Sequence, residues 1–290
     1  MTLSQGNIGA AEGRARELLR VAEASDDPDR RLWAEHALAG SLANLGHFEE
    51  ALDHALALRD VGRERPELFA RPKARAALTM VAIYQGLAAV QLCEHDLAEE
   101  AWREQLESAE APGGNLFEVA LALTNAATVL IWQSDATRLR PVAARLGAVA
   151  EETGMELFRG WADLYGGWAM AMTGDLETGI AALISGIETH LRQGQVLGVG
   201  GYFARLAEAQ LAAGDVVGAL ASVDQSLGMR SEQRWPRVEV LRIQGHILER
   251  SDIAAARACY LDALELGRQF DGRLLVRAVE ADLQRLEEAR

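Results

Sequence analysis

The chain has 290 residues, of which 49% are hydrophobic but only 6% aromatic. Such a composition suits close-packed helices rich in Ala, Leu and Val better than it suits sheets. The formal net charge of -14 argues against unaided binding to nucleic acid or to an anionic membrane surface, because both need clustered positive charge.

Cysteine usage and the amino-terminal sequence bear on where the protein works. Cys93 and Cys259 lie far apart in the sequence and show no metal-ligand spacing, which favours a reduced protein. The first residues show no basic segment followed by an apolar stretch, so the sequence predicts neither a signal peptide nor a membrane span. We therefore expect a cytoplasmic protein.

Apolar residues at helical spacing predict an all-α fold throughout the chain. In chain order we expect an opening helix near 6–24, six helix pairs and a closing helix near 272–289. The pairs are 28–45 with 48–62, 73–93 with 97–110, 115–133 with 136–152, 155–173 with 176–193, 196–213 with 216–228, and 236–249 with 253–269. The closing helix has one apolar face, which is typical of a helix that caps a stack.

A short turn recurs between the two helices of each pair. Its copies begin at Gly46, His95, Ser134, Gly174, Gly214 and Ser251, so that successive copies are 49, 39, 40, 40 and 37 residues apart. In most copies an Asp follows, and its side chain can cap the next helix. A fixed period near 40 residues indicates stacked helix pairs, with one enlarged unit.

Small residues recur on both sides of this turn. Seven positions before it stand Ala39, Ala88, Ala127, Gly167 and Ala207, with Gly245 one residue out of step. About five positions after it stand Ala51, Ala101, Gly179, Ala219 and Ala256, while the third unit has Leu139 instead. Small residues at these places let two helix backbones cross closely.

These positions resemble the tetratricopeptide (TPR) family over roughly residues 28–270. The segments 33–52 and 206–220 carry the resemblance best, with Leu38, Ala39, Gly46 and Ala51 in the first. The resemblance implies a right-handed superhelical solenoid of about six TPR-like hairpins with amino- and carboxyl-terminal capping helices. We expect a single domain, 1–290, whose repeats span about 28–62, 66–110, 115–152, 155–193, 196–228 and 232–269.

In this family the first helix of each pair lines a concave groove that binds the partner. Carrying the family's groove positions across implies a site made of Trp33, His36, Gln85, Thr124, Thr128, Trp132, Trp161, Tyr165, Trp168, Met172, Glu208, Arg242 and His246. Trp161, Tyr165, Trp168 and Met172 follow one another at helical steps, and an exposed stripe of that kind would bind an apolar peptide segment or a small apolar ligand. The alternative is that these rings fill the space between repeats.

No motif typical of a catalytic or nucleotide-binding site is evident in the sequence. The sequence has no GxxxxGK[ST] loop, HExxH or GxSxG motif, and its paired glutamates fall in first or last helical turns, where solvation or the helix dipole accounts for them. We therefore expect no catalytic residue, no metal site, no cofactor and no enzyme activity.

Residues 194–270 also resemble the helical repeats of bacterial signalling ATPases and transcriptional activators of the MalT-like group. In that group such repeats receive an inducer or an inhibitory protein. The resemblance implies a protein- or peptide-binding sensor or adaptor in signalling or transcription regulation, as a stand-alone relative or a fragment of a larger regulator. The alternative is a structural scaffold that homodimerises through its outer or terminal helices.

Overall fold

The computed structural model describes residues 7–65, 67 and 72–288, and it contains no strand among them. Fourteen α-helices account for most of this part of the chain. They are α1 (Ile8–Ser25), α2 (Pro28–Leu45), α3 (Phe48–Glu64), α4 (Pro72–Gln91), α5 (His95–Glu110), α6 (Leu116–Trp132), α7 (Ala136–Thr153), α8 (Glu156–Met172), α9 (Leu176–Arg192), α10 (Val199–Ala212), α11 (Val216–Gly228), α12 (Arg237–Leu248), α13 (Ile253–Gly267) and α14 (Arg273–Glu288).

The prediction of an all-α fold is confirmed, and each expected helix is present with ends that differ by a few residues. The largest shift is at α10, which begins at Val199 where 196 was expected; the other described ends differ by two residues or fewer. The expected beginnings at 6 and 66 and the expected end at 289 lie outside the described residues.

In three copies of the short turn, the Asp that was expected to cap the next helix does so. The carboxylates of Asp135, Asp215 and Asp252 each accept a hydrogen bond from a backbone N–H in the first turn of the next helix. Asp175 occupies the same place without a side-chain cap hydrogen bond, and Asp96 lies inside α5. The turn is therefore common to these copies, whereas the cap is not.

The close crossing predicted from small residues is confirmed between α8 and α9. A Cβ atom added to Gly167 would lie 2.7 Å from both the carbonyl oxygen of Gly179 and the backbone nitrogen of Leu183. A Cβ added to Gly179 would lie 2.6 Å from the carbonyl oxygen of Gly167. Backbone therefore meets backbone at this crossing, and only glycine fits there.

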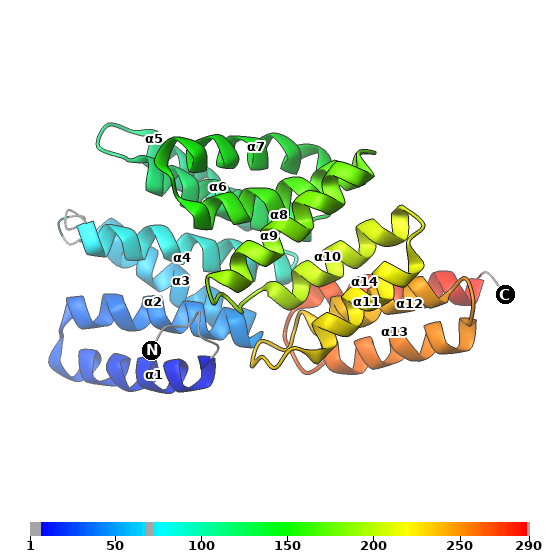
Figure 1. Ribbon diagram of the computed structural model, residues 1–290. Helices are drawn as coiled ribbons and strands as arrows, with labels where there is room; N and C mark the ends of the chain where they lie inside the picture. Colours follow the sequence, from blue (N-terminus) through cyan, green and yellow to red (C-terminus); the bar gives the residue numbers. More distant parts are fainter. Residues whose placement is uncertain (1–6, 66, 68–71, 289–290) are drawn as a thin grey trace.

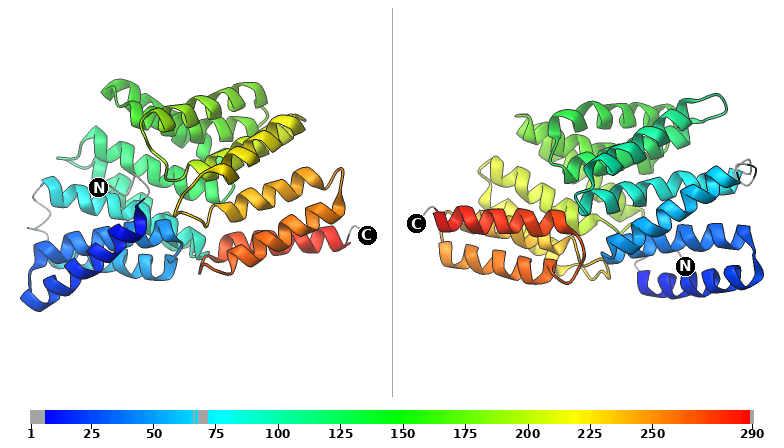
Figure 2. Two further views of the ribbon diagram at one scale, coloured as in Figure 1. Left: turned by 60° about the horizontal axis from the view of Figure 1, so that its bottom comes forward. Right: turned by 180° about the vertical axis from the view of Figure 1, so that it is seen from behind.

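Consecutive helices pack against each other along the chain, and several alternate helices also touch. The alternate pairs include α2 with α4, α4 with α6, α10 with α12, and α12 with α14. Helices α1–α4 form one side of the molecule and α10–α14 the other, with α5–α8 across the top (Figure 1). The two sides approach each other below α6 and α8, as two further views show (Figure 2).

The first and last parts of the chain share one apolar core. It contains Leu42 and Phe48 from the amino-terminal helices together with Trp235, Leu264 and Val279 from the carboxyl-terminal part. The helices of the two ends are thus held by direct packing as well as through the helices between them.

Polar contacts reinforce this meeting of the two ends. The carboxylate of Asp271 accepts hydrogen bonds from the backbone N–H groups of Phe48 (2.6 Å) and Glu49 (3.0 Å), so a distant loop caps α3. The amide of Gln233 donates to the side-chain oxygen of Asn44 at 2.8 Å within the interior. A sequence-local cap at His47 is not formed.

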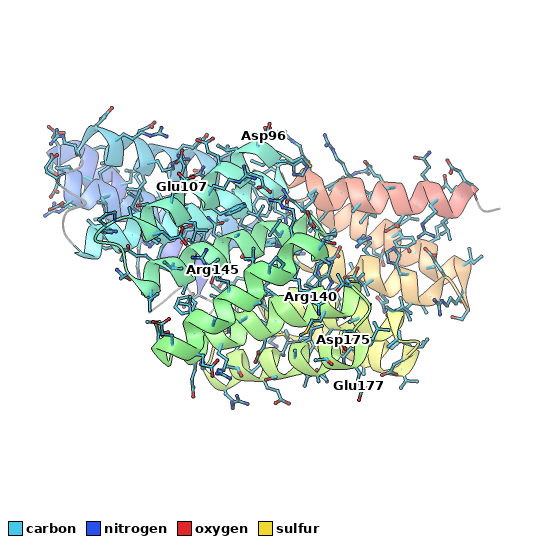
Figure 3. All side chains as sticks on the ribbon, turned by 90° about the horizontal axis from the view of Figure 1, so that it is seen from above. Asp96, Glu107, Arg140, Arg145, Asp175 and Glu177 are labelled. Carbon is cyan, nitrogen blue, oxygen red and sulfur yellow. The ribbon has the colours of Figure 1, made fainter. Side chains whose placement is uncertain are left out.

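The outward helices α5, α7 and α9 carry many charged side chains, among them Asp96, Glu107, Arg140, Arg145 and Glu177 (Figure 3). Ion pairs join neighbouring outer helices, because Arg138 of α7 reaches Glu99 of α5 at 2.7 Å and Arg145 pairs with Glu110. Such exposed pairs each contribute little to stability but keep the surface solvated. No helix among the described residues is both long and apolar enough to cross a bilayer.

Candidate functional site

The thirteen residues expected in the groove all lie on the first helices of the predicted pairs. Trp33 and His36 are on α2, Gln85 is on α4, Thr124, Thr128 and Trp132 are on α6, four residues are on α8, Glu208 is on α10, and Arg242 and His246 are on α12. Contacts between side chains, several of them through Arg205 and Glu239, join members on α6, α8, α10 and α12 into one network, which we call the inner surface.

An aromatic cluster forms the α8 end of the inner surface. The ring of Trp161 stacks on Tyr165 with centroids 5.5 Å apart, and the rings of His190 and Tyr202 pack against Trp161 edge-on. The hydroxyls of Tyr165 and Thr128 are hydrogen-bonded at 2.8 Å. Burial raises the pKa of Tyr165 to about 12.

The expected exposed stripe on α8 is interrupted by burial. Tyr165 is 1% exposed and Trp168 is 2% exposed, whereas Trp161 and Met172 are partly exposed. Helix α8 is enclosed because it contacts α6 and α10 as well as α7 and α9. The alternative interpretation therefore applies to Tyr165 and Trp168: their rings fill space between helices.

A chain of charged and hydrogen-bonded groups continues from Trp168. Its indole nitrogen donates to the carboxylate of Glu208 at 2.7 Å, and Arg205 binds the same carboxylate at 3.0 Å. The Arg205 guanidinium also lies over the Trp168 ring, 5.2 Å from its centroid, and over the Trp132 ring at 5.3 Å. Three successive first helices, α6, α8 and α10, therefore meet at one arginine.

The same network extends through α12 to α14. Glu239, which is 1% exposed, pairs with Arg205 at 3.1 Å and with Arg242 at 2.7 Å. Arg242 in turn binds Asp282 of α14 at 2.9 Å, and the Nε2 atom of His246 lies 2.8 Å from the same carboxylate. Glu208, Arg242 and His246 keep part of their side chains exposed to solvent.

Pairing sets the protonation of the buried Glu239 and the half-buried Asp282. Burial alone would raise the pKa of Glu239, but the positive charges of Arg242 and Arg205 outweigh it and lower that pKa to about 2. The pKa of Asp282 is likewise about 2, because hydrogen bonds and charge from His246 and Arg242 outweigh burial. Both acids are therefore ionised at neutral pH, and both arginines are held by carboxylates of the chain itself.

Sequence reasoning missed Arg205, Glu239 and Asp282, which complete this network. A signal was present, because Arg205 stands three residues before Glu208 and Glu239 three residues before Arg242, a spacing that puts each pair on one helix face. Both of the missed residues on α10 and α12 interrupt otherwise apolar stretches.

The remaining groove residues have other surroundings. Trp33 is 40% exposed and contacts His36, which in turn packs against Tyr84. The hydroxyls of Thr124 and Thr128 donate to carbonyl oxygens one turn earlier in α6. Gln85 is fully buried, and neither polar atom of its side chain has a partner among the described residues.

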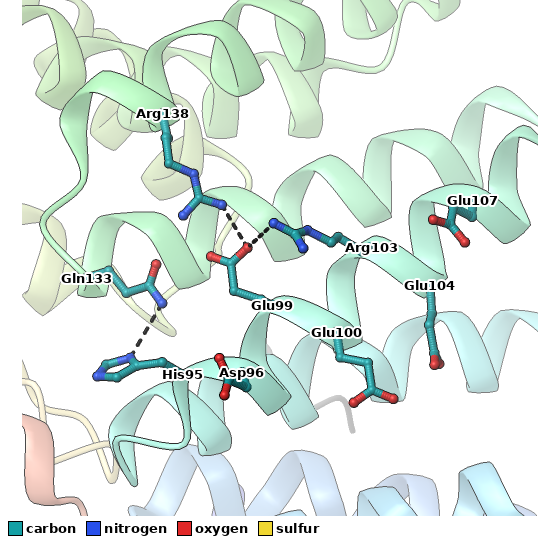
Figure 4. Close-up of a pocket in the computed structure, with 9 residues that line it drawn as sticks. All are labelled: His95, Asp96, Glu99, Glu100, Arg103, Glu104, Glu107, Gln133 and Arg138. Carbon is teal, nitrogen blue, oxygen red and sulfur yellow. Dashed lines mark hydrogen bonds and ion pairs between the residues drawn. The ribbon is translucent and has the colours of Figure 1, made fainter.

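An open, acidic hollow of about 580 Å³ lies on the outer side of α5 (Figure 4). Glu99 at its centre binds Arg138 at 2.7 Å and Arg103 at 3.1 Å, while Glu100, Glu104 and Glu107 line it. Arg59 of α3 pairs with Glu104 from the opposite side. The carboxylates of α5 thus hold arginines from both neighbouring outer helices.

Comparisons with known proteins leave the chain without an assigned family: no protein-family model matches it, and no curated protein matches it by sequence. Within the described part of the chain, no group of three or more His, Cys, Asp or Glu side chains is placed to hold a metal ion. The geometry of the inner surface therefore provides the basis for a functional interpretation.

Proposed function

We propose that this chain is a non-enzymatic, TPR-like binding module that takes up a protein or peptide segment on its inner surface. Its helices would form a right-handed superhelix of about six hairpins between two capping helices. The recurring turn near every 40 residues, the glycine crossing of α8 and α9, and the contacts between alternate helices support this architecture.

One observation carries the proposal. Side chains expected from the repeat on α8, α10 and α12 are joined, through the buried Arg205 and Glu239, into one network that is partly open to solvent. Trp161 and Met172 supply apolar area at one end, and Glu208, Arg242 and His246 supply hydrogen-bonding groups at the other. A peptide with an apolar residue followed by polar ones matches that order.

The resemblance to repeats of MalT-like regulators suggests the setting. There, a segment of this kind receives a signal and passes it to a separate effector. We propose a sensor or adaptor role of that kind, in the cytoplasm of a bacterium, with a small apolar ligand as a second class of occupant for the Trp161 end.

The test compares two matched double variants in pull-downs from native lysate, read out by quantitative mass spectrometry. Trp161→Ala with His246→Ala removes two partly exposed groups of the inner surface, and Leu191→Ala with Val217→Ala removes two exposed apolar side chains of the outer helices. The inner variant should lose its specific partners while its circular dichroism stays unchanged. Partners that survive the inner variant and disappear with the outer one would refute the proposal.

A scaffold that homodimerises through outer helices is the second candidate, and one observation favours it. Large apolar side chains are exposed on α9, α11 and α13, namely Ile184, Leu191, Val216, Val217, Ile253 and Leu261, with Val217 80% exposed. Under this alternative, multi-angle light scattering would detect a dimer that the Leu191→Ala and Val217→Ala variant converts to a monomer. The binding-module proposal predicts no effect of that variant on oligomeric state.

A further inference from the structure

The longest connection between consecutive helices is the segment 229–236, between α11 and α12. It is not an insertion, because the turns on either side of it are only 37 residues apart, the smallest spacing in the chain. Instead the two helices are short, with 13 residues in α11 and 12 in α12. We call residues 228–237 the arginine loop, because Arg230, Arg234 and Arg237 lie in it.

Buried side chains hold the arginine loop in place. The carboxamide of Gln233 accepts a hydrogen bond from the backbone N–H of Gly198 at 2.7 Å and donates one to Asn44 at 2.8 Å. Trp235 is buried against two other aromatic rings. Arg234 stands between these two anchors in the sequence and is exposed. The loop therefore presents its arginines on a fixed backbone, so a ligand would not have to order it.

An open hollow of about 610 Å³ lies at the arginine loop and is lined by all three of its arginines. Glu232 is the one acid among the described residues that line it, so the hollow has a formal charge of +2 in a chain whose net charge is -14. Salt screens the charge of the remaining chain over about 8–10 Å. Close to the loop an anion is therefore attracted, although the protein as a whole repels it.

These three arginines differ from most others in having no carboxylate partner. Elsewhere arginines pair within the chain, as Arg285 does with Glu249. Arg230, Arg234 and Arg237 make no ion pair with any described residue, although Glu232 lines the same hollow. The carboxylate of Glu232 instead accepts a hydrogen bond at 2.7 Å from the backbone N–H of Gly9, at the start of α1.

Arg237 is the most firmly placed of the three. It is half-buried, and its guanidinium donates to the carbonyl oxygen of Leu227 at 3.0 Å. An arginine has five N–H donors in a fixed fork, so this bond leaves others for a second acceptor. The exposed Arg230 and Arg234 supply further donors to the same hollow.

The rest of the lining includes apolar side chains, which narrows the kind of ligand. Val196, Leu227 and Met229 line the hollow and are each partly exposed. A free phosphate ion would leave this apolar area uncovered. A nucleic acid would need a longer run of positive charge than the loop has. A peptide with carboxylates on both sides of an apolar residue matches the charge and the apolar area together.

We infer that the arginine loop binds an acidic peptide segment of a partner protein, in which carboxylates flank an apolar side chain. The carboxylates would accept hydrogen bonds from the arginines, and the apolar side chain would pack on Leu227 and Met229. None of the residues that line this hollow belongs to the groove positions expected from the repeat. The inference therefore goes beyond the function proposed for the inner surface and does not depend on it.

A series of probes tests the inference on the wild-type chain. In low salt, the N-acetylated, C-amidated pentapeptide Glu-Glu-Leu-Glu-Glu should bind with a dissociation constant below about 1 mM. Replacing its glutamates by glutamine should weaken binding by about tenfold or more, and replacing its leucine by serine by about fivefold. Inorganic phosphate should bind more weakly than the pentapeptide.

Amide chemical shifts in NMR titrations measure these affinities and locate the site. The largest shifts should fall at residues 228–237 and near Val196. The inference would be overturned by largest shifts elsewhere, by no binding of the pentapeptide at millimolar concentration, or by equal binding of the glutamine peptide. Phosphate that binds at the loop as tightly as the pentapeptide would show a site for free anions, and this would overturn it too.

Two double variants with the same change in net charge separate the loop from the overall charge. Arg230→Gln with Arg234→Gln should weaken binding of the pentapeptide by about tenfold, because two donors of the hollow are lost. Arg250→Gln with Arg277→Gln is the matched control: both arginines are exposed, neither makes an ion pair with a described residue, and neither lines the hollow. It should change binding by less than about twofold.

Both double variants should melt at the wild-type temperature, because all four side chains are exposed. Equal weakening in the two variants would show that only the net charge matters, and unchanged binding in the loop variant would show that its arginines do not contact the peptide. Either result would overturn the inference. The peptide series on the wild-type chain remains decisive even if a variant folds poorly.

Discussion

The indole rings of Trp132 and Trp235 lie 5.1 Å apart, although the first ends α6 and the second precedes α12. Trp235 also packs edge-on against Phe48, at 5.3 Å. This column of three rings connects the beginning, the middle and the end of the helical array. It fills space that an open array would leave to solvent, and the two ends of the molecule therefore depend on each other.

We predict that Trp235→Ala lowers the free energy of unfolding by about 3–5 kcal/mol, because Trp235 is 3% exposed and the cavity left behind has no side chain to refill it. Urea denaturation measures the change. Hydrogen exchange should then increase in the turn between α2 and α3 as well as near residue 235. A loss of protection confined to the carboxyl-terminal helices would contradict the mutual dependence of the two ends.

Asp271→Ala tests the polar part of the same contact. Removing a capping carboxylate costs about 1 kcal/mol, and here the affected helix end belongs to α3, far away in sequence. Exchange of the Phe48 and Glu49 amides should increase. Asp252→Ala provides the matched control, because Asp252 caps α13 locally and its loss should leave α3 protected.

The helices were predictable because their signals are local: apolar spacing, turn residues and small residues act within one hairpin. The contact between Phe48 and Asp271 was not, because no local pattern specifies which distant loop caps α3. For the inner surface, repeat position placed Glu208 and Arg242 on the neighbouring helices α10 and α12, but it did not indicate Arg205 and Glu239, which join them. It did not predict the burial of Trp168, which depends on how closely α8 approaches α10.

Adjacent glycines of α8 provide a sharp test of the helix crossing. Gly167→Ala places a methyl group 2.7 Å from backbone atoms of α9, so it should destabilise the protein by about 1–3 kcal/mol. In Gly166→Ala the new methyl has as its nearest neighbour the Ala143 Cβ at 3.5 Å, an ordinary contact, so better helix propensity should stabilise the protein by about 0.5–1 kcal/mol. Opposite signs are expected in denaturant unfolding. Equal effects would show that α8 and α9 do not cross at Gly167.

The buried acid Glu239 should be essential to the charge network. Glu239→Gln leaves Arg205, which is 4% exposed, without full compensation, and a loss of about 3–5 kcal/mol is expected. Glu280→Gln is the control, because Glu280 is exposed and its nearest partner, Arg268, is 3.9 Å away; it should cost less than about 1 kcal/mol. Comparable losses in the two variants would show that the network contributes no more than a surface ion pair.

His190 should make the protein sensitive to mild acid. It is 1% exposed, its Nε2 atom has no partner among the described residues, and burial lowers its pKa to about 4 from an ordinary 6.5. Between these values the unfolded chain binds the proton and the folded chain does not, so the free energy of unfolding decreases as the pH falls. The loss from pH 7 to pH 4.5 should be about 2 kcal/mol for this group.

The variant His190→Phe keeps an aromatic ring against Trp161 and Tyr202 but cannot bind a proton. Its unfolding free energy should therefore depend less on pH than that of the wild type between pH 7 and pH 4.5, whatever its stability at pH 7. Part of the slope should persist, because burial also lowers the pKa of His36. Urea titrations could instead show the same dependence of unfolding free energy on pH for wild type and variant. That result would mean that His190 has the same pKa in the folded and unfolded chains, and that the ring cluster does not hold it neutral.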